Sequence, residues 1–153
     1  MAKPIIRNST IRDMRFGDNV VIVEPVNLYE AIIGSECFVG PFTEIQKGVL
    51  IGDRCRIQSH SFICEHVTIG NDCFVGHGVM FINDDFRSGY PASRSGGELK
   101  KTVVGDRVSI GSNATILPVN ICNDCVIGAG AVVTSDIVEK GFYIGNPARK
   151  LEK

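Results

Sequence analysis

The sequence predicts an all-β domain built as a triangular prism, and three periodic features lead to that fold. Large apolar residues recur every six positions, the residue after them is often Gly, and the fifth residue of each unit is small or β-branched. A period of six matches neither a helix, at about 3.6 residues per turn, nor an extended strand, at about 2. Each unit is therefore expected to form a short strand followed by a corner. The large apolar series consists of Ile33, Val39, Ile45, Ile51, Ile57, Ile63, Ile69, Val75 and Phe81.

Three corners close one coil of the prism, so one coil takes eighteen residues. Gly at a corner supplies backbone freedom, and the strands of successive coils stack in parallel about 4.8 Å apart. Burial of one Ile or Val per unit contributes roughly 1.5–3 kcal/mol, and each coil covers the next, so only a contiguous stack is stable. The small inward series consists of Cys37, Thr43, Val49, Cys55, Ser61, Val67, Cys73 and Val79.

The coils begin near Phe16 and contain two changes of register. The first is a one-residue slip between Leu28 and Ile33. The second is a one-residue deletion between Pro118 and Ile121, after which the six-residue steps continue.

A long segment without register interrupts the prism. Phe81 and Val104, the apolar positions on either side of it, are twenty-three residues apart. The residues between them show no apolar period, so we expect a loop excursion at about 83–103 that leaves the prism. With this loop, the pattern predicts about five to six coils in a single domain, residues 1–153.

Charge and hydropathy exclude several kinds of partner. The chain has 16 Lys and Arg against 17 Asp and Glu, a formal net charge of −1, and so lacks the basic footprint of a nucleic-acid binder. No apolar run approaches the roughly 20 residues that a membrane span needs, and residues 1–4 lack the apolar stretch of a signal peptide. We therefore expect a cytoplasmic protein with neither nucleic acid nor a membrane as partner.

Cysteine usage indicates thiols in a reducing compartment, because 6 Cys in 153 residues are too sparse for a disulfide scaffold. Cys37, Cys55 and Cys73 are eighteen residues apart and are expected to form one inward column of core-filling side chains. Cys125 falls on an inward small position and Cys122 on a turn position, so this pair is expected to face different ways.

Several segments carry the motifs of a known family. They are the recurring Ile/Val/Leu-Gly units, the runs at 111–118 and 127–134, and the closing run at 145–149. Over nearly the whole chain these segments resemble the hexapeptide-repeat acyltransferases. The resemblance implies a left-handed parallel β-helix, an exception to the right-handed crossover rule, assembled as a homotrimer with acetyl-CoA between neighbouring subunits.

Further segments are similar to one branch of that family. The runs at 24–29, 40–46, 58–65 and 76–84 resemble the N-acetyltransferases of nucleotide-linked 3-amino sugars. The resemblance implies transfer of an acetyl group from acetyl-CoA to the amine of a dTDP- or UDP-linked amino-deoxy sugar used in bacterial surface polysaccharides. Two departures from that branch are a missing residue near Val119 and the lack of a Pro-Arg pair after the Asn-Asp. The second departure favours a deoxy-amino sugar on dTDP over a UDP-linked uronic acid.

Asn83 and His77 are the candidate catalytic residues. Acetyl transfer from a thioester needs an unprotonated amine close to the carbonyl and stabilisation of the oxyanion. Eighteen-residue spacing stacks Asn83 above Glu65 and Lys47, at the root of the loop. The resemblance gives Asn83 the role of orienting the sugar amine through its amide oxygen, and a corner-forming Asn is the structural alternative. His77 stacks above Ser59 as a base or orienting group, or as a solvated histidine.

Four polar residues form a first group of candidates for substrate contact. Glu44, Gln46, Gln58 and His60 follow one another along the coil path, and both glutamines stand where the repeat usually has Gly. Local departures from a repeat tend to coincide with function. Outward-facing residues without a function are the alternative.

Tyr29 and Asp84 complete the candidates for substrate contact. Tyr29 stacks beneath Gln46 and could cover a ring, while a half-exposed strand aromatic is the structural alternative. Asp84 stacks over His66, which favours a structural acid and base pair over contact with substrate.

Residues of the last coils are the candidates for binding acetyl-CoA. Ser112, which follows Gly111, and Ala129 take equivalent places in two late units, and their backbone groups could line the pantetheine chain. Arg149 and Lys150 would offer cations to the phosphates of CoA. A basic end of a chain is also commonly just solvated.

Three rival functions remain open. A carbonic anhydrase of the same fold would place His60, His66 and His77 around Zn²⁺, although residues six apart point about 120° apart in a three-sided coil. A non-catalytic scaffold needs neither the long polar loop nor Asn83. An O-acetyltransferase acting on a sugar or antibiotic hydroxyl would depend more strongly on His77 as base.

Overall fold

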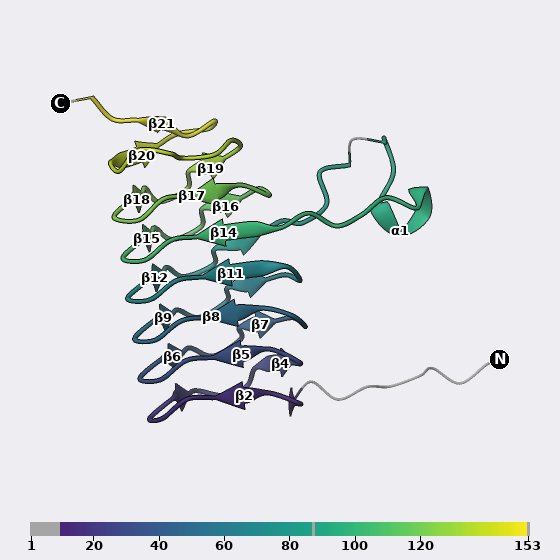
Figure 1. Cartoon of the computed structure of the whole chain (residues 1–153), viewed down its shortest axis with the longest axis vertical. Coiled ribbons are helices and arrows are strands. Elements are labelled where there is room, and N and C mark those ends of the chain that lie inside the picture. The colour runs from purple at the N-terminus through teal and green to yellow at the C-terminus, as the bar shows by residue number, and fades with distance from the viewer. Residues whose placement is uncertain (1–9, 87, 153) are drawn as a thin grey trace.

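The computed structural model describes residues 10–86 and 88–152 and confirms the predicted fold class (Figure 1). It is a parallel β-solenoid in which strands of two or three residues alternate with corners, and the coils stack along the long axis. Among the described residues, one antiparallel pair occurs, between the last two strands. The one helix of this part of the chain, α1 (Ala92–Ser95), lies in the loop.

Three sheets, called A, B and C here, form the sides of the prism, and the chain visits them in that order. Sheet A holds β1 (Ile11–Arg12), β4 (Asn27–Tyr29), β7 (Glu44–Ile45), β10 (Phe62–Ile63), β13 (Met80–Phe81), β16 (Thr115–Ile116) and β19 (Val132–Val133). Sheet B holds β2 (Arg15–Phe16), β5 (Ile32–Ile33), β8 (Leu50–Ile51), β11 (Val67–Ile69), β14 (Thr102–Val104) and β17 (Asn120–Ile121). Sheet C holds β3 (Val21–Ile22), β6 (Phe38–Val39), β9 (Arg56–Ile57), β12 (Phe74–Val75), β15 (Ser109–Ile110), β18 (Val126–Ile127), β20 (Phe142–Ile144) and β21 (Arg149–Lys150).

The solenoid has about seven turns, since sheet A contains seven strands. The expectation of five to six coils was too low because the apolar count ran from Phe16 to Val133, whereas β1 lies before this range and β20 and β21 lie after it. The winding is left-handed, as the resemblance implied. In Figure 1, β14 receives the chain from the loop on the right and crosses the near side towards β15, while the coils climb from the N-terminus.

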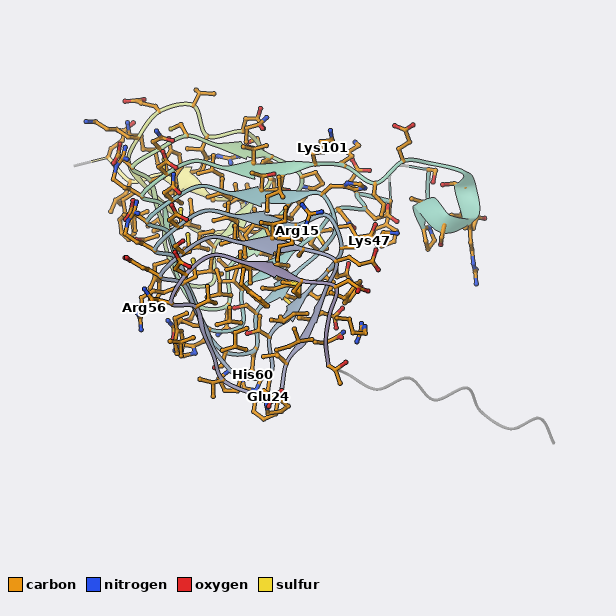
Figure 2. The ribbon with its side chains drawn as sticks, turned by 60° about the horizontal axis from the view of Figure 1, so that its bottom comes forward. Arg15, Glu24, Lys47, Arg56, His60 and Lys101 are labelled. Carbon is orange, nitrogen blue, oxygen red and sulfur yellow. The ribbon has the colours of Figure 1, made fainter. Side chains whose placement is uncertain are left out.

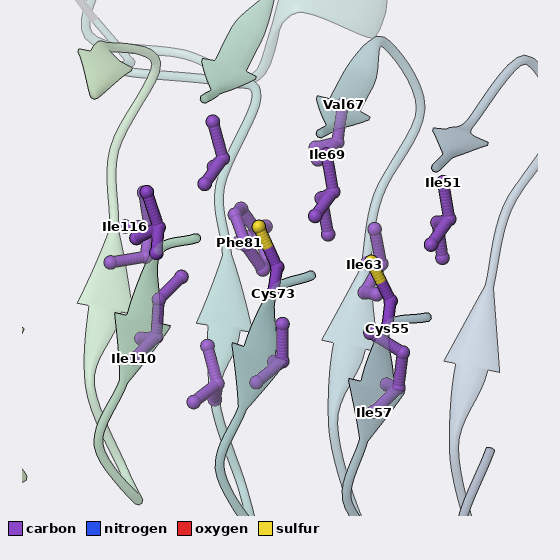
Figure 3. Close-up of a cluster of buried hydrophobic side chains, with 14 of the residues drawn as sticks. Ile51, Cys55, Ile57, Ile63, Val67, Ile69, Cys73, Phe81, Ile110 and Ile116 are labelled. Atoms are coloured by element: carbon purple, nitrogen blue, oxygen red, sulfur yellow. The ribbon is translucent and has the colours of Figure 1, made fainter. Parts of the chain in front are cut away.

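The two six-residue series form the core, as predicted. From Ile33 to Phe81 the large apolar residues are at most 4% exposed, and from Cys37 to Val79 the small ones are at most 2% exposed. Figure 3 shows Cys55 and Cys73 at equivalent places in adjacent coils, beside the isoleucines of the large series. The predicted column of core-filling thiols is therefore confirmed, and the backbone N–H of Cys55 donates to the Cys37 sulfur at 3.3 Å.

The corners that join sheets B and C, called the B/C edge, are held by a ladder of side-chain oxygens. The edge comprises residues 34–37, 52–55, 70–73, 105–108 and 122–125. At each step an oxygen of one coil accepts a backbone N–H from the coil before it, at 2.7–2.9 Å. The accepting residues are Asp53, Asn71, Asp106 and Asn123.

The corners that join sheets C and A, called the C/A edge, are held by buried hydroxyls. Thr43 Oγ1 donates to the Gly40 carbonyl at 2.8 Å, and Ser61 Oγ donates to the Gly76 carbonyl of the next coil at 3.0 Å. This edge comprises residues 40–43, 58–61, 76–79, 111–114 and 128–131. Both ladders tie a fixed number of residues per corner to the neighbouring coil.

The corners that join sheets A and B, called the A/B edge, carry both one-residue slips and the loop. The slips shorten the corners at 30–31 and 117–119. The loop leaves after β13 and returns at β14, so Thr102 and Val103, expected within the excursion at 83–103, already belong to sheet B. Its base is closed by the backbone N–H of Lys100, which donates to the Asn83 carbonyl at 2.8 Å.

We expect the inward series to carry the stability of the stack. Val75→Ala removes two methyl groups from a side chain with 0% exposure and should lower the free energy of unfolding by about 2 kcal/mol. Val21→Ala, the same change in the same sheet at a position 54% exposed, is the matched control and should change little. Urea unfolding followed by circular dichroism measures both, and equal losses would contradict the inward assignment.

Candidate active site

The predicted site residues lie on two different edges of sheet A. Gln46, expected near Gln58 and His60, lies past the far end of β7 on the A/B edge, whereas Glu44 begins β7 beside the C/A edge, where its N–H donates to the Ser61 carbonyl at 3.0 Å. Figure 2 shows His60 at one corner of the triangular outline and Lys47, the neighbour of Gln46, at another. Closeness along the coil path was therefore a poor guide to closeness in space.

On the C/A edge, His77 is held by the coil beneath it. Ser59 Oγ and His77 Nδ1 are 2.8 Å apart, and the imidazole is exposed. When Nδ1–H donates to the serine oxygen, Nε2 carries the lone pair and faces outward to accept a proton. The stacking expected from the eighteen-residue spacing thus gives a histidine in the geometry of a general base.

The candidate acetyl-CoA residues of the late coils continue the same column. The pairing of Val75 with Ile110 places Ser112 above His77, and the pairing of Ile110 with Ile127 places Ala129 above Ser112. The two corners are hydrogen-bonded to each other, since the N–H of Gly130, next to Ala129, donates to the Ser112 carbonyl at 2.8 Å.

Gly111 has a structural reason to be glycine. A Cβ atom at this position would lie 2.4 Å from the Ala129 nitrogen, so the two coils could not approach each other.

The other two candidates on the C/A edge differ from each other. The exposed ring of His60 lies against Phe42, with centroids 4.9 Å apart. Gln58 is half-buried, and its carbonyl accepts the hydroxyls of Thr43 at 3.3 Å and Ser61 at 2.8 Å. The backbone of Gln58 therefore supports the corner, directly before Ser59, the partner of His77.

On the A/B edge, Asn83 caps a polar column. Its amide Nδ2 donates to the Glu65 carbonyl at 3.2 Å, which leaves the amide oxygen as an acceptor, and the Glu65 carboxylate lies 3.6 Å from Lys47 Nζ. Glu65 is a residue that the sequence-based set of site residues missed. The eighteen-residue spacing from Asn83 was the signal that could have added it.

Glu44, Gln46 and Tyr29 gather just below this column. Gln46 Nε2 donates to Glu44 Oε1 at 2.9 Å, and Gln46 Oε1 accepts the Glu65 N–H at 3.3 Å. Burial, followed by the charges of Glu44 and Glu65, raises the pKa of Tyr29. The guanidinium of Arg12 lies 5.0 Å from the centre of the tyrosine ring. Gln46 is thus hydrogen-bonded to Glu44 and to the backbone of Glu65, and Tyr29 lies close enough to both carboxylates to feel their charge.

Asp84 has another role than the one expected. Its two carboxylate oxygens accept the N–H groups of Phe86 at 3.0 Å and Ala92 at 2.7 Å, so it organises the loop. The expected place of Asp84 over His66 is taken by Lys101, because the chain leaves the prism after Asn83 and re-enters with Lys101.

The two basic residues near the C-terminus are not equivalent. Arg149 is exposed and bonds to the neighbouring Ala148 carbonyl at 2.9 Å. Lys150 forms an ion pair with Glu139, which raises the pKa of the lysine. Both side chains belong to β21, at the end of the stack that follows Ala129.

The three histidines do not converge within one chain. His66 lies on the A/B edge, whereas His60 and His77 lie on the C/A edge. Within residues 10–86 and 88–152, no group of three or more His, Cys, Asp or Glu side chains is arranged to hold a metal ion. In the same part of the chain, no helix has the length and apolarity needed to cross a membrane.

Comparison with known proteins identifies the repeat. The family model "Bacterial transferase hexapeptide (six repeats)" matches residues 30–65, and "Hexapeptide repeat of succinyl-transferase" matches residues 101–135. The bifunctional protein GlmU of Carboxydothermus hydrogenoformans is 34% identical over 154 residues, which cover 95% of this chain and 34% of GlmU. The chain thus spans about a third of the length of the curated relatives that it matches.

Solved structures share the fold. A variant of AntD, an N-acyltransferase from Bacillus cereus solved with dTDP and coenzyme A, has a TM-score of 0.81 at 20% identity, covering 90% of this chain and 82% of AntD. A hexapeptide-repeat acetyltransferase from Vibrio cholerae, solved with acetyl coenzyme A, has a TM-score of 0.69 at 27% identity, covering 78% of this chain and 69% of that one.

We expect Asp84 to anchor the loop. Asp84→Ala removes the acceptor for two backbone N–H groups, so tryptic cleavage after the exposed Arg94 should become several-fold faster while the circular dichroism of the prism stays unchanged. Ser93→Ala, an exposed change in the same loop, is the control. Equal cleavage rates for both variants and the parent would show that the loop does not depend on this carboxylate.

Proposed function

We propose that this chain, which belongs to the hexapeptide-repeat transferase superfamily, is an N-acetyltransferase. It would transfer an acetyl group from acetyl-CoA to the amine of a dTDP- or UDP-linked amino sugar. The names of the solved relatives support both halves of the reaction, since AntD is an N-acyltransferase seen with dTDP and coenzyme A. The observation in this chain that carries the proposal is the exposed His77 imidazole, fixed by Ser59 at 2.8 Å.

The chemistry asks little of the protein beyond positioning. The amine lone pair attacks the thioester carbonyl carbon, the C–N bond forms, the C–S bond breaks, and the CoA thiolate leaves. The amine gives up one proton, which His77 Nε2 would accept and pass to the thiolate. A thiol with a pKa near 8.5 is a good leaving group, so alignment of amine and carbonyl is the main requirement.

Asn83 would supply that alignment on the acceptor side. Its amide oxygen is left free by the bond from Nδ2 to Glu65 and could accept a hydrogen bond from the sugar amine. Glu44, Gln46 and Tyr29 lie beneath it and would contact the sugar or its nucleotide. On the donor side, Ser112 and Ala129 would line the pantetheine chain above His77, with Gly111 beside them.

Arg149 and Lys150 would complete the donor side at the end of the stack. The exposed Arg149 is the better placed of the two for the CoA phosphates, because Lys150 already pairs with Glu139. Gln58 and His60, on the same edge as His77, would contact the acceptor that lies against it.

One chain cannot hold both halves of this site. His77 precedes β13 on the C/A edge and Asn83 follows it on the A/B edge, so the two side chains stand at opposite edges of sheet A, at most about 20 Å apart along the backbone. A homotrimer with parallel axes would bring the C/A edge of one chain against the A/B edge and loop of the next. Each of the three sites would then take its base from one chain and its amide from another.

A hydroxyl acceptor is the second candidate, favoured by the same contact between His77 and Ser59. A hydroxyl is far less nucleophilic than a neutral amine, so O-acetylation depends on a base. Sugar or antibiotic hydroxyls are the acceptors in that case, with the donor side unchanged.

Activity of two variants distinguishes the acceptors. With acetyl-CoA and a panel of dTDP- and UDP-linked amino sugars, release of free thiol should occur with at least one amino sugar. For an amine acceptor, Asn83→Ala should lower kcat/KM more than His77→Ala, because a neutral amine attacks without a base and alignment is the main requirement. For a hydroxyl acceptor, His77→Ala should be the more severe change. Ser109→Ala, on the outer face of sheet C, is the control. No turnover with any amino sugar by intact protein would refute the acceptor assignment.

Mixing the two inactive variants tests the shared site. The two variants, His77→Ala and Asn83→Ala, are unfolded, mixed in equal amounts and refolded together. A site between chains is then complete when one chain supplies His77 and its neighbour supplies Asn83, which occurs in about a quarter of the sites. Activity should therefore return to about a quarter of that of the parent, whereas a site within one chain would regain none. Refolding each variant alone is the control.

A further inference from the structure

Two thiols at the B/C edge lie in contact, which the sequence did not predict. Cys122 and Cys125 were expected to face different ways, yet their sulfur atoms lie 3.5 Å apart. The corner at 122–125 is a tight turn in which Asp124 adopts φ 61°, and such a turn brings its first and fourth residues together. The repeat assigns Cys125 to an inward position and Cys122 to a turn position, but it does not describe how a turn brings these two residues into contact.

The surroundings of this pair differ from those of the other four cysteines. Cys37, Cys55, Cys64 and Cys73 are each at most 2% exposed, so a reagent in solution cannot reach them in the folded chain. Cys122 is half-buried, whereas Cys125 is fully buried, with its sulfur 3.8 Å from the Glu139 carbonyl. The pair therefore joins an accessible thiol to a protected one.

We propose that Cys122 and Cys125 form a reversible redox site that is oxidised to an intrachain disulfide by small disulfides of the glutathione class. The two sulfurs need to approach by about 1.5 Å to reach the bond length of about 2.05 Å. This site is separate from the proposed acetyl transfer and does not depend on it.

The reaction proceeds by two exchanges. The Cys122 thiolate attacks one sulfur of the small disulfide, an S–S bond forms, and one thiolate leaves. Cys125, having lost its proton to solvent, then attacks the Cys122 sulfur and releases the second thiolate. Two cysteine thiols and one small disulfide become one protein disulfide and two small thiols, so the protein loses two electrons and two protons.

The environment of the two thiols gives the order of these steps. Burial raises the pKa of Cys125 to about 11, so few of these thiols are ionised at neutral pH. Cys125 is therefore the resolving group, and its step should quicken about tenfold per pH unit below that value. The disulfide closes a loop of only a few residues and adds little chain-entropy stabilisation, which suits a reversible site better than a structural one.

Thiol counting on the intact chain tests the proposal. The reduced protein is incubated with oxidised glutathione, quenched with acid, unfolded and titrated for free thiols, and its peptides are mapped by mass spectrometry. The parent should lose two of its 6 thiols, joined as the peptide pair that contains Cys122 and Cys125. Cys64→Ala, which removes a buried thiol elsewhere, should lose the same two.

Single replacements of the pair separate its members. Cys125→Ser should stop with one glutathione on Cys122, and Cys122→Ser should lose no thiol at all. The proposal is overturned if the unmodified chain at pH 9 also forms only a mixed disulfide with one glutathione, or if the mapped disulfide joins other cysteines. Circular dichroism of each variant shows that the solenoid is intact, so that an exposed core thiol is not mistaken for a reactive one.

Discussion

Hydrogen bonding between the backbones of stacked coils is the interaction on which the rest of the structure depends. Each strand has only two or three residues, too few to persist without its neighbours, and is held by the coil on either side. Inward side chains consequently meet their equivalents seventeen or eighteen positions away, as Val104 meets Ile121 and Ile33 meets Ile51. The core is therefore a set of columns, and a change at one level acts mainly on the adjacent coils.

A prism filled by its own columns leaves no interior in which to build a site. Chemistry is confined to the outside, and polar side chains can act together only when they follow one column or when two surfaces meet. His77 with Ser59, and Asn83 with Glu65, are columns of this kind on separate edges. The division of the site between chains proposed above suits such a shape, because His77 and Asn83 stand on different edges of one chain.

Much of this arrangement could be predicted because the register converts sequence distance into spatial distance. The buried series from Ile33 to Phe81 and the contact of His77 with Ser59 come from counting alone. Counting failed where the path departs from the register. Asp84 turns into the loop and Lys101 takes its place over His66, a substitution that no local periodicity reveals.

Corners were the second place where the sequence was insufficient. The meeting of Cys122 with Cys125 depends on the conformation of a tight turn rather than on a repeat. Likewise Gln46 and Gln58 follow each other along the path yet lie on different edges of the prism. Glu65 carried no unusual feature of its own and gained significance only through its neighbours above and below.

The A/B edge has a consequence for how this architecture could diversify. At the B/C and C/A edges, side-chain oxygens and hydroxyls bond to the neighbouring coil, and the corners keep one length. The A/B edge instead contains corners shortened by one residue and the long loop that closes between Asn83 and Lys100. Additional residues inserted at the A/B edge would leave the hydrogen bonds between stacked coils intact. Insertions at the A/B edge could therefore change what binds beside Asn83 without altering the C/A edge, where Ser112 and Ala129, proposed to line the pantetheine chain of acetyl-CoA, lie.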